Sequence, residues 1–310
     1  MQVIRYKYPE KAELGDSVIA LGFFDGVHSA HRALIDKCIK IARETGVASA
    51  LLTFENDGLL KSNSSRLYTA EQRLALIEKT GIDRVILCDF ESINGLNTRE
   101  FVTDVLKRDL SARAIVAGYN FKYGKGALGN SDTLIRDGKD AGLSVYIEEE
   151  IKGEGESISA TAIRSALKSG DVTKANKMLV IPYHVNGKVA HGIGVGSKKG
   201  FPTVNISLQN PDILRLGVYV TGVVIDGKLY TGLTNVGKCP TILSREVHAE
   251  TTILNFNSDV YGKDVDIYFL EYIRDERLFD SVDELRAQIE IDKKRLEKRG
   301  EVTWQEIGLS

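Results

Sequence analysis

The chain has 310 residues and a formal net charge of −2 at pH 7, with 43% hydrophobic and 27% charged residues. This composition is typical of a soluble globular protein of two domains, and the charge provides no field to recruit nucleic acid or an anionic membrane. No apolar run approaches the roughly 20 residues of a membrane-spanning helix, and residues 1–6 lack a signal-peptide core. Cys38, Cys88 and Cys239 are widely separated, which argues against a disulfide framework or zinc site. We therefore expect a cytoplasmic protein that uses neither nucleic acid nor a membrane as partner.

The first half of the chain alternates apolar, β-rich runs with helical patterns. Such alternation predicts a doubly wound parallel sheet covered on both faces, an α/β domain. Ligands bind beyond the carboxyl ends of such strands, so the loops that follow them should share one rim. The expected strands are 18–23, 47–54, 84–89, 113–117 and 143–147, and the expected helices are 30–44, 70–80, 98–109 and 132–141. Thr69 and Gln72 form a capping-box pattern before the second helix.

The most specific motif is Gly-Phe-Phe-Asp-Gly-Val-His-Ser-Ala-His at residues 22–31, between the first of these strands and its helix. His28 and His31 are three residues apart, so both should point from one side of the first helical turn. A helix N-terminus with free N–H groups and two imidazoles is suited to hold a polyphosphate. A phosphate would favour the charged imidazoles, which would then neutralise a leaving pyrophosphate. The alternatives are a metal site, for which no third ligand is evident, and ordinary surface histidines.

Two further segments support a phosphate interpretation. Ser159 or Thr161 is expected to cap a short helix, with Arg164 one turn inside it, which forms a second phosphate cradle. The alternative is a plain capped helix with a surface arginine. Residues 118–126 interleave aromatic residues with glycine and lysine, a pattern that can stack on a flat ring and reach phosphate. The alternative there is an ordinary flexible surface loop.

The pattern changes near residue 180, where short strands begin to dominate. Two helices, at 162–168 and 172–179, precede this change, and a final helix is expected at 282–299. Six short strands and a terminal helix predict a six-stranded β-barrel with a C-terminal helix. The expected strands are 184–189, 203–207, 218–225, 229–236, 251–256 and 265–273. We place the two domains at residues 1–182 and 183–310.

Two polar patterns in the second half contain candidate metal-binding and catalytic residues. Thr203 and Asn205 lie one residue apart on a strand, so they share a face, and hard oxygen ligands at this spacing suit Mg²⁺. Glu250 stands at the head of a predicted strand, where a carboxylate can accept the proton of an attacking alcohol. The alternative for Thr203 and Asn205 is an ordinary strand after a glycine loop, and the alternative for Glu250 is a solvated glutamate at a strand end.

Taken together, these motifs resemble a known family. Residues 22–31, 118–124 and 159–164 resemble the FMN adenylyltransferase module of bacterial bifunctional FAD synthetases, which belongs to the HxxH-type nucleotidyltransferases. From about residue 183 onward the chain resembles riboflavin kinase, through Gly-Phe-Pro-Thr-Val-Asn at 200–205 and the segments that follow. The resemblance implies phosphorylation of riboflavin by MgATP to FMN, and then transfer of AMP from a second ATP to FMN, giving FAD and pyrophosphate.

The resemblance also implies roles for individual residues. The catalytic residues would be His28 and His31, which hold the triphosphate, Arg164 on the leaving phosphates, and Glu250 as general base on the riboflavin 5′-hydroxyl. Thr203 and Asn205 would bind Mg²⁺ and ATP phosphate. Further ATP contacts would come from Gly22, Phe23, Asp25, Gly26, Ser159, Thr161, Gly196, Lys198, Gly200 and Pro202. Flavin contacts would come from Asn120, Phe121, Tyr123, Arg274 and Phe279.

Several positions depart from the family pattern and keep alternatives open. The departures are Ala30, Asn56-Asp57, Asn120, Ala160, Ser197 to Lys199 and Thr252. Of these, Asn56-Asp57, Asn120 and Ala160 motivate the alternative of a degenerate paralogue in which one module has lost activity. A flavin-binding regulatory protein that contacts RNA or a partner is a second alternative, against which the absence of a basic stripe counts. A third is adenylyl or cytidylyl transfer to another phosphate ester. Self-association is left open.

Overall fold

The computed structural model describes residues 1–12, 14–55, 66–190, 203–238, 247–254, 256, 258, 260–277 and 279–309. The chain divides into two compact units, Met1–Ala160 and Thr161–Ser310. The division between the units falls after residue 160 of the chain, whereas the domain boundary predicted from the sequence falls after residue 182.

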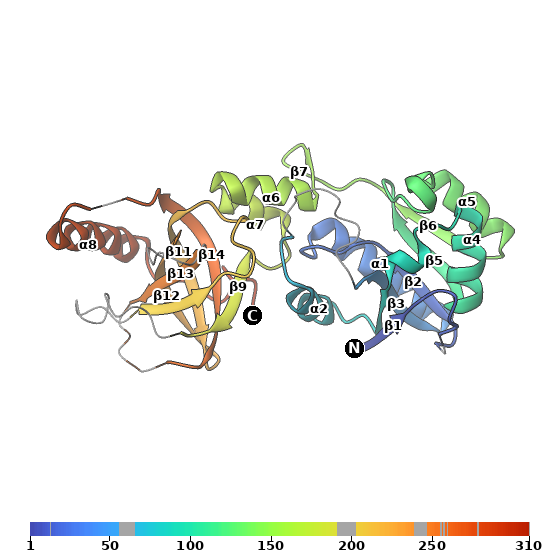
Figure 1. Cartoon of the computed structure of the whole chain (residues 1–310), viewed down its shortest axis with the longest axis horizontal. Helices are drawn as coiled ribbons and strands as arrows, with labels where there is room; N and C mark the ends of the chain where they lie inside the picture. Colours follow the sequence, from blue (N-terminus) through green and yellow to red (C-terminus); the bar gives the residue numbers. More distant parts are fainter. Residues whose placement is uncertain are drawn as a thin grey trace. The chain divides into compact units, whose positions relative to one another are not determined.

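The first unit contains a six-stranded, fully parallel sheet in the order β1-β4-β3-β2-β5-β6 (Figure 1). This arrangement confirms the doubly wound parallel sheet expected from the sequence. The strands are β1 Gln2–Tyr6, β2 Ser17–Leu21, β3 Ala48–Phe54, β4 Arg84–Cys88, β5 Ala112–Gly118 and β6 Ser144–Glu148. Strand β1 was not predicted from the sequence, because only Tyr6 of this edge strand is buried and the strand has no apolar run.

Both faces of the sheet are covered, and the burial of β2 explains its apolar run Val18–Leu21. All five residues of β2 are buried. Ile19 and Leu21 pack in a core with residues of the helical layer that contains α4 and α5, and Figure 1 shows α1 on the other face of the sheet. The helices are α1 Ser29–Thr45, α2 Ala70–Glu78, α3 Phe90–Ile93, α4 Thr98–Glu100 and α5 Ser131–Asp140. Shorter elements are the 3₁₀ turn η3 Lys125–Ala127 and the strands β7 Lys152–Gly153 and β8 Glu156–Ser157.

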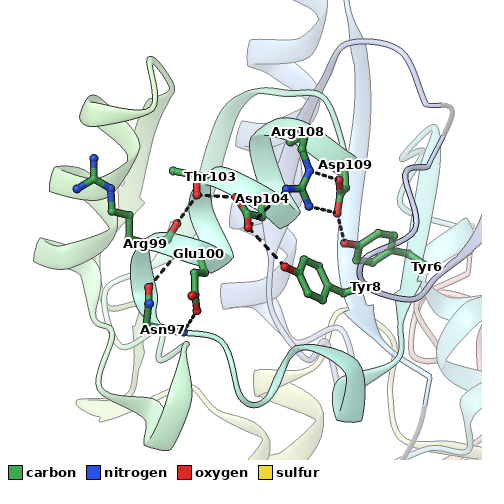
Figure 2. A network of polar contacts seen from close by, with 9 residues as sticks. All are labelled: Tyr6, Tyr8, Asn97, Arg99, Glu100, Thr103, Asp104, Arg108 and Asp109. Atoms are coloured by element: carbon green, nitrogen blue, oxygen red, sulfur yellow. Dashed lines mark hydrogen bonds and ion pairs between the residues drawn. The ribbon is translucent and has the colours of Figure 1, made fainter.

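The helix expected at 98–109 is only partly an α-helix. It continues from α4 into a π-helix, η2, over Phe101–Asp109. Its last residue, Asp109, is 1% exposed, and its carboxylate accepts hydrogen bonds from Tyr6 Oη (2.8 Å) and from Arg108 Nε (2.7 Å). These donors compensate for the burial of the carboxylate, which would otherwise be costly. Figure 2 shows how this network ties η2 to the N-terminal strand.

The second unit contains a six-stranded antiparallel sheet in the order β10-β13-β12-β11-β14-β9. Its two end strands approach each other, because Ala190 forms a bridge with Asn205 and its N–H donates to the Asn205 carbonyl oxygen (2.9 Å). The sheet is therefore a nearly closed barrel, as the sequence predicts. The strands are β9 His184–Lys188, β10 Thr203–Ser207, β11 Gly217–Ile225, β12 Lys228–Lys238, β13 Val247–Ile253 and β14 Asp264–Arg274.

Three helices accompany the barrel within the second unit: α6 Ala160–Ser169, α7 Val172–Met178 and α8 Val282–Arg299. Arg215 donates its backbone N–H to the Leu167 carbonyl at the end of α6 (3.2 Å). Asn176 of α7 donates from Nδ2 to the Phe269 carbonyl of β14 (2.8 Å). These contacts explain why α6 and α7 pack with the barrel, although the sequence places them before the predicted boundary.

One face of the strands in this unit lies inside the barrel and the other is covered in part by α8. Inside, the buried hydroxyls of Thr221, Thr234 and Thr251 form a chain with O···O distances of 2.8 Å. Outside, Leu233 of β12 shares a core cluster with Leu296 of α8. Side chains alternate between the two faces along a strand. Residues of β12 and β13 that point out of the barrel can therefore face a substrate, whereas those that point into it cannot.

Candidate active sites

The loop between β2 and α1 is held in an unusual backbone conformation. Phe24 (φ 56°), Gly26 (φ 89°) and Val27 (φ 41°) all adopt left-handed φ values. For a β-branched residue such as Val27 this conformation is an outlier, and each such non-glycine position costs on the order of 1–3 kcal/mol. A Cβ at Gly22 would lie 2.9 Å from the Phe24 ring. The motif at residues 22–31 therefore encodes a strained, tightly folded loop.

His28 and His31 face the same side of the first turn of α1, as the sequence predicts. His28 is the N-cap residue, and its Nδ1 accepts the backbone N–H of His31 (3.3 Å). The two rings stack with their centroids 3.6 Å apart and an interplanar angle of 16°. His28 is only 5% exposed, and the Phe24 ring lies 5.0 Å from that of His31. The pair is thus a preformed unit at the positive end of a 17-residue helix.

Burial controls the charge of these imidazoles. It lowers the pKa of His28 to about 4. The pKa of His31 is also well below its ordinary value, first because of burial and then because of repulsion from a charged His28. Both rings are therefore neutral at pH 7 in the folded chain. An adjacent anion would raise both pKa values, since an opposite charge favours the protonated form.

Asp25 and Phe23 contact the segment that leads into α2 and the first turn of that helix. Both carboxylate oxygens of Asp25 accept the backbone N–H of Leu67 (3.1 Å each), so this side chain has a role in holding the loop. The Phe23 ring lies against two guanidinium groups, at 4.6 Å from Arg66 and 4.9 Å from Arg73. Neither arginine was predicted from the sequence as a site residue. Arg73 carries no signal in the sequence, because an arginine in a helical pattern is usually exposed.

The loop after β5 presents only part of its aromatic set. Tyr123 is 6% exposed, packs with Phe101 (ring centroids 5.4 Å apart), and its hydroxyl donates to Asp137 (3.4 Å). Burial raises the pKa of its hydroxyl to about 12. Tyr123 thus serves as a support on which the Phe121 ring stacks at 5.8 Å, while Asn120 is exposed. Of the three predicted flavin contacts in this loop, Phe121 and Asn120 are the better placed for a ligand.

The segment at 159–164 forms the N-terminal end of α6. Thr161 is the second residue of the helix, so it lies inside the first turn, and Ser159 immediately precedes the helix. Of the two residues predicted as possible N-caps, Thr161 is therefore excluded. Arg164 Nη2 donates to Thr161 Oγ1 (3.1 Å), which brings a guanidinium and a hydroxyl together within the first turn.

The register of three antiparallel strands assembles a second site. Asn205 of β10 lies opposite Glu250 of β13, and Glu250 in turn lies opposite Asn235 of β12. Thr203 Oγ1 donates to Glu250 Oε1 (3.1 Å), and Asn205 Nδ2 donates to Thr203 Oγ1 (3.2 Å). The predicted pair Thr203 and Asn205 does share one face, and Glu250 joins it there. Asn235 begins one of the segments that resemble riboflavin kinase, but no role was predicted for it, because its approach to Glu250 depends on the pairing of β12 with β13.

The position of Glu250 within its strand differs from the prediction. The strand covers Val247–Ile253 instead of 251–256, so Glu250 lies at its centre. Its exposed side chain alternates with the buried Ala249 and Thr251. A mid-strand carboxylate flanked by paired strands is better fixed than one at a strand end. The predicted ATP contacts Gly196, Lys198, Gly200 and Pro202 lie outside the described residues.

Arg274, a predicted flavin contact, makes a structural ion pair. Its Nε and Nη2 donate to Asp292 of α8 at 3.1 and 2.7 Å, and the Asp292 carboxylate is buried. Arg274 Nη1 also donates to the Asp275 carbonyl oxygen (3.1 Å). The ion pair joins the end of β14 to α8. The half-buried Phe279 ring lies 5.9 Å from the Arg277 guanidinium, in the segment between β14 and α8.

The buried histidine pair makes the first unit sensitive to acid. Because the pKa of His28 is about 4 when folded and about 6.5 when unfolded, the unfolded chain binds the extra proton between these values. Stability is therefore lost as the pH falls from 6.5 towards 4. The substitution His28→Asn removes this titration but keeps an N-cap side chain. When the pH is lowered from 7 to 5, we expect the free energy of unfolding to fall by about 2 kcal/mol less in this variant than in the parent. Urea unfolding of the first unit at the two pH values measures this.

His248→Asn, a substitution in the other unit, is the control for this measurement and should leave the acid response of the first unit unchanged. If His28→Asn and the parent lose equal stability between pH 7 and pH 5, the His28 imidazole is not held neutral by burial.

Comparison with known proteins identifies both halves of the chain. The FAD synthetase family model matches residues 10–162, and the riboflavin kinase family model matches residues 179–299. A bifunctional riboflavin kinase/FMN adenylyltransferase from Bacillus subtilis (strain 168) is 33% identical over 306 residues, covering 94% of this chain and 96% of its own. The protein of the same name from Pseudomonas fluorescens is 30% identical over 300 residues, with the same coverage.

A solved structure matches nearly the whole fold. It is the crystal structure of a protein from Streptococcus pneumoniae named as a macrolide-efflux protein, with a TM-score of 0.85, 31% identity and coverage of 95% of this chain and 98% of that one. In the part of our chain that the structure describes, we find no helix with the length and apolar character to cross a membrane. The two family models and the curated relatives agree with the motifs in both units. The chain therefore belongs to the family of bifunctional riboflavin kinase/FMN adenylyltransferases.

Proposed function

We propose that the two halves of this chain act in succession on one flavin. As a member of its family, the chain phosphorylates riboflavin with ATP to give FMN and ADP, and then transfers AMP from ATP to FMN to give FAD and pyrophosphate. We assign AMP transfer to residues 1–182 and riboflavin phosphorylation to residues 183–310. Both reactions are displacements at phosphorus, so positioning and charge neutralisation supply most of the catalysis.

For AMP transfer, the stacked pair of His28 and His31 is proposed to hold the triphosphate of ATP. The N-terminus of α1 and two imidazoles offer donors and a partial positive charge to an anion. As negative charge accumulates on the departing pyrophosphate, the pKa of each ring rises and protonated imidazole becomes favourable. The FMN phosphate oxygen attacks the α-phosphorus, and the bond from the α-phosphorus to the pyrophosphate oxygen breaks. We further propose that Ser159, Thr161 and Arg164 contact the leaving phosphates.

For riboflavin phosphorylation, Glu250 is proposed to accept the proton of the riboflavin 5′-hydroxyl as that oxygen attacks the γ-phosphorus. The exposed carboxylate of Glu250 is held at 3.1 Å from Thr203 Oγ1. The bond to ADP breaks and the proton remains on Glu250 until solvent removes it. Geometry is the support for this role, because a general base must reach the proton it removes.

The residues beside Glu250 fit a bound Mg²⁺. A hydroxyl oxygen from Thr203, an amide oxygen from Asn205 and the Glu250 carboxylate gather on one face of β10 and β13. These are hard oxygen donors in small number, which suits an ion that keeps water and phosphate ligands. We propose that Thr203 and Asn205 hold it; when bound, the ion would neutralise charge on the ATP phosphates.

We also propose that the protein works in the cytoplasm on small molecules. The described cysteines, Cys38 and Cys88, are both buried free thiols, which is compatible with a reducing compartment. For the flavin we retain Asn120 and Phe121 in the first half, and Arg274 and Phe279 in the second, as proposed contacts.

The observation that carries the kinase assignment is the register of β10, β13 and β12 around Glu250. One assay tests the whole proposal: the purified chain is incubated with riboflavin, ATP and Mg²⁺, and the flavins are separated by chromatography. We expect FAD. FMN alone would mean that the AMP-transfer module has lost activity, and unchanged riboflavin would leave a flavin-binding protein as the better explanation.

His31→Ala should abolish FAD formation while FMN still accumulates from riboflavin. Loss of one imidazole from the triphosphate site should reduce AMP transfer roughly 100-fold or more, because it removes stabilisation of developing charge. The measurement is the initial rate of FAD formation from supplied FMN. Riboflavin phosphorylation in the same preparation is the control, and its parallel loss would contradict the division of labour.

Glu250→Ala should show the opposite pattern, with no FMN formed from riboflavin but normal conversion of supplied FMN to FAD. We expect Glu250→Gln, which keeps the size of the side chain and a partner for Thr203, to lose roughly 100-fold or more in phosphorylation rate as well. Full activity of Glu250→Gln would rule out a proton-accepting role and leave Glu250 as a residue that positions Thr203.

A further inference from the structure

Arg73 is a fully buried cation whose place in the fold calls for an explanation. It lies on α2, is 1% exposed, and is the largest of the fully buried side chains. Arginine is almost never buried to this extent unless its donors are engaged. Its guanidinium donates hydrogen bonds to the end of β3 and to the residue that follows β2 by two positions.

The guanidinium joins the loop that follows β2 to the last two residues of β3. Nη1 donates to the Phe23 carbonyl oxygen (3.1 Å) and to Thr53 Oγ1 (3.4 Å), and Nη2 donates to the Phe54 carbonyl oxygen (2.6 Å). Thr53 Oγ1 itself donates to the Phe23 carbonyl oxygen (2.9 Å). One planar group thus links two carbonyls at which the chain leaves the parallel sheet. Only the fork of an arginine offers several donors in a fixed plane for such a contact.

The position of Arg73 is itself determined by its surroundings. The capping box of Thr69 and Gln72 sets the start of α2. The Phe23 ring lies against the guanidinium at 4.9 Å. Asp25, two residues further along the loop, accepts the Leu67 N–H with both carboxylate oxygens. The strained loop that leads to His28 is therefore fastened at two points, Phe23 and Asp25, to residues 67–73.

We propose that Arg73 is a positioning residue for AMP transfer, which holds the loop of residues 22–28 in the conformation that presents His28 and His31. This inference rests on the proposed role of that loop in binding the triphosphate. Arg73 need not touch the nucleotide, since its Nη1 and Nη2 atoms donate to Phe23, Thr53 and Phe54. The fork geometry matters as well as the charge, because a lysine ammonium cannot span the same two carbonyls in one plane.

The test compares Arg73→Lys and Arg73→Met in the full chain. We expect both to lower kcat for conversion of FMN to FAD roughly 30- to 100-fold, because a displacement of about 1 Å in a catalytic group has an effect of this size. The KM for FMN should change less than about threefold, since the loss lies in the transition state. Riboflavin phosphorylation by the same preparations should stay within about twofold of the parent, because Arg73 belongs to the first unit.

A merely structural role would give a different result. Rates are therefore measured well below the unfolding midpoint of each variant, where the folded fraction is close to one. If kcat is restored there, or if Arg73→Lys is as active as the parent, the positioning role is overturned. Arg43→Lys, which changes an exposed arginine in the last turn of α1, is the matched control and should leave both reactions unchanged.

The His31→Ala variant separates this proposal from the one on which it rests. If His31→Ala retains AMP transfer, the triphosphate assignment of the loop fails and the inference about Arg73 fails with it. If His31→Ala is inactive while Arg73→Lys is fully active, the assignment of the loop stands and only the role of Arg73 is rejected.

Discussion

Strand register is the constraint on which both candidate sites depend. In the first unit, parallel pairing sets Leu21 of β2 level with Leu52 of β3 and Ala117 of β5. The loops that carry the histidines and residues 118–124 therefore leave the sheet at the same edge. In the second unit, antiparallel pairing sets Glu250 between Asn205 and Asn235. A slip of one residue would turn each of these side chains to the other face of its strand.

The two sites use burial in opposite ways. In the histidine pair His28 is buried and stacked on the half-buried His31, and both imidazoles are neutral at pH 7. This arrangement lets an anion, and the charge that develops on it, determine the protonation of the rings. Glu250, in contrast, is exposed and accepts a hydrogen bond from Thr203. A substrate hydroxyl can therefore reach the carboxylate from solvent, as the proposed role of Glu250 requires.

The sequence was sufficient to predict a structural feature where a local pattern of residues has only one structural explanation. Continuous apolar runs predicted the buried strands, the capping box at Thr69 was confirmed, and the spacing of His28 and His31 put both rings on one side of the helix. It was insufficient where tertiary contacts decide. The π-helix η2 depends on packing, β1 is a half-exposed edge strand, and α6 packs with the barrel.

Site residues were hardest to predict when their partners lie far away in the chain. Arg73 bonds to carbonyls 50 and 19 residues distant, and Arg274 pairs with Asp292 across 18 residues. Neither contact leaves a local trace in the sequence, because an arginine in a helix or at a strand end is usually solvated. Tyr123 is a further example, because a glycine-rich aromatic loop suggests exposure, whereas this side chain is buried and its ring stacks on that of Phe121.

The departures from the family pattern become easier to interpret once they are placed in the fold. Thr252 lies directly opposite Thr203 on the outward face, two residues from Glu250, so a hydroxyl occupies the position beside the proposed magnesium ligands. Ala30 lies in the first turn of α1 between the two histidines, where its small side chain leaves their ring stacking undisturbed. Asn120 is exposed next to Gly118, at the end of β5. These three replacements are compatible with the stacked histidines and with the polar cluster at Glu250, which favours two working modules over a chain that retains only one. The departures at residues 56–57 and 197–199 lie outside the described residues.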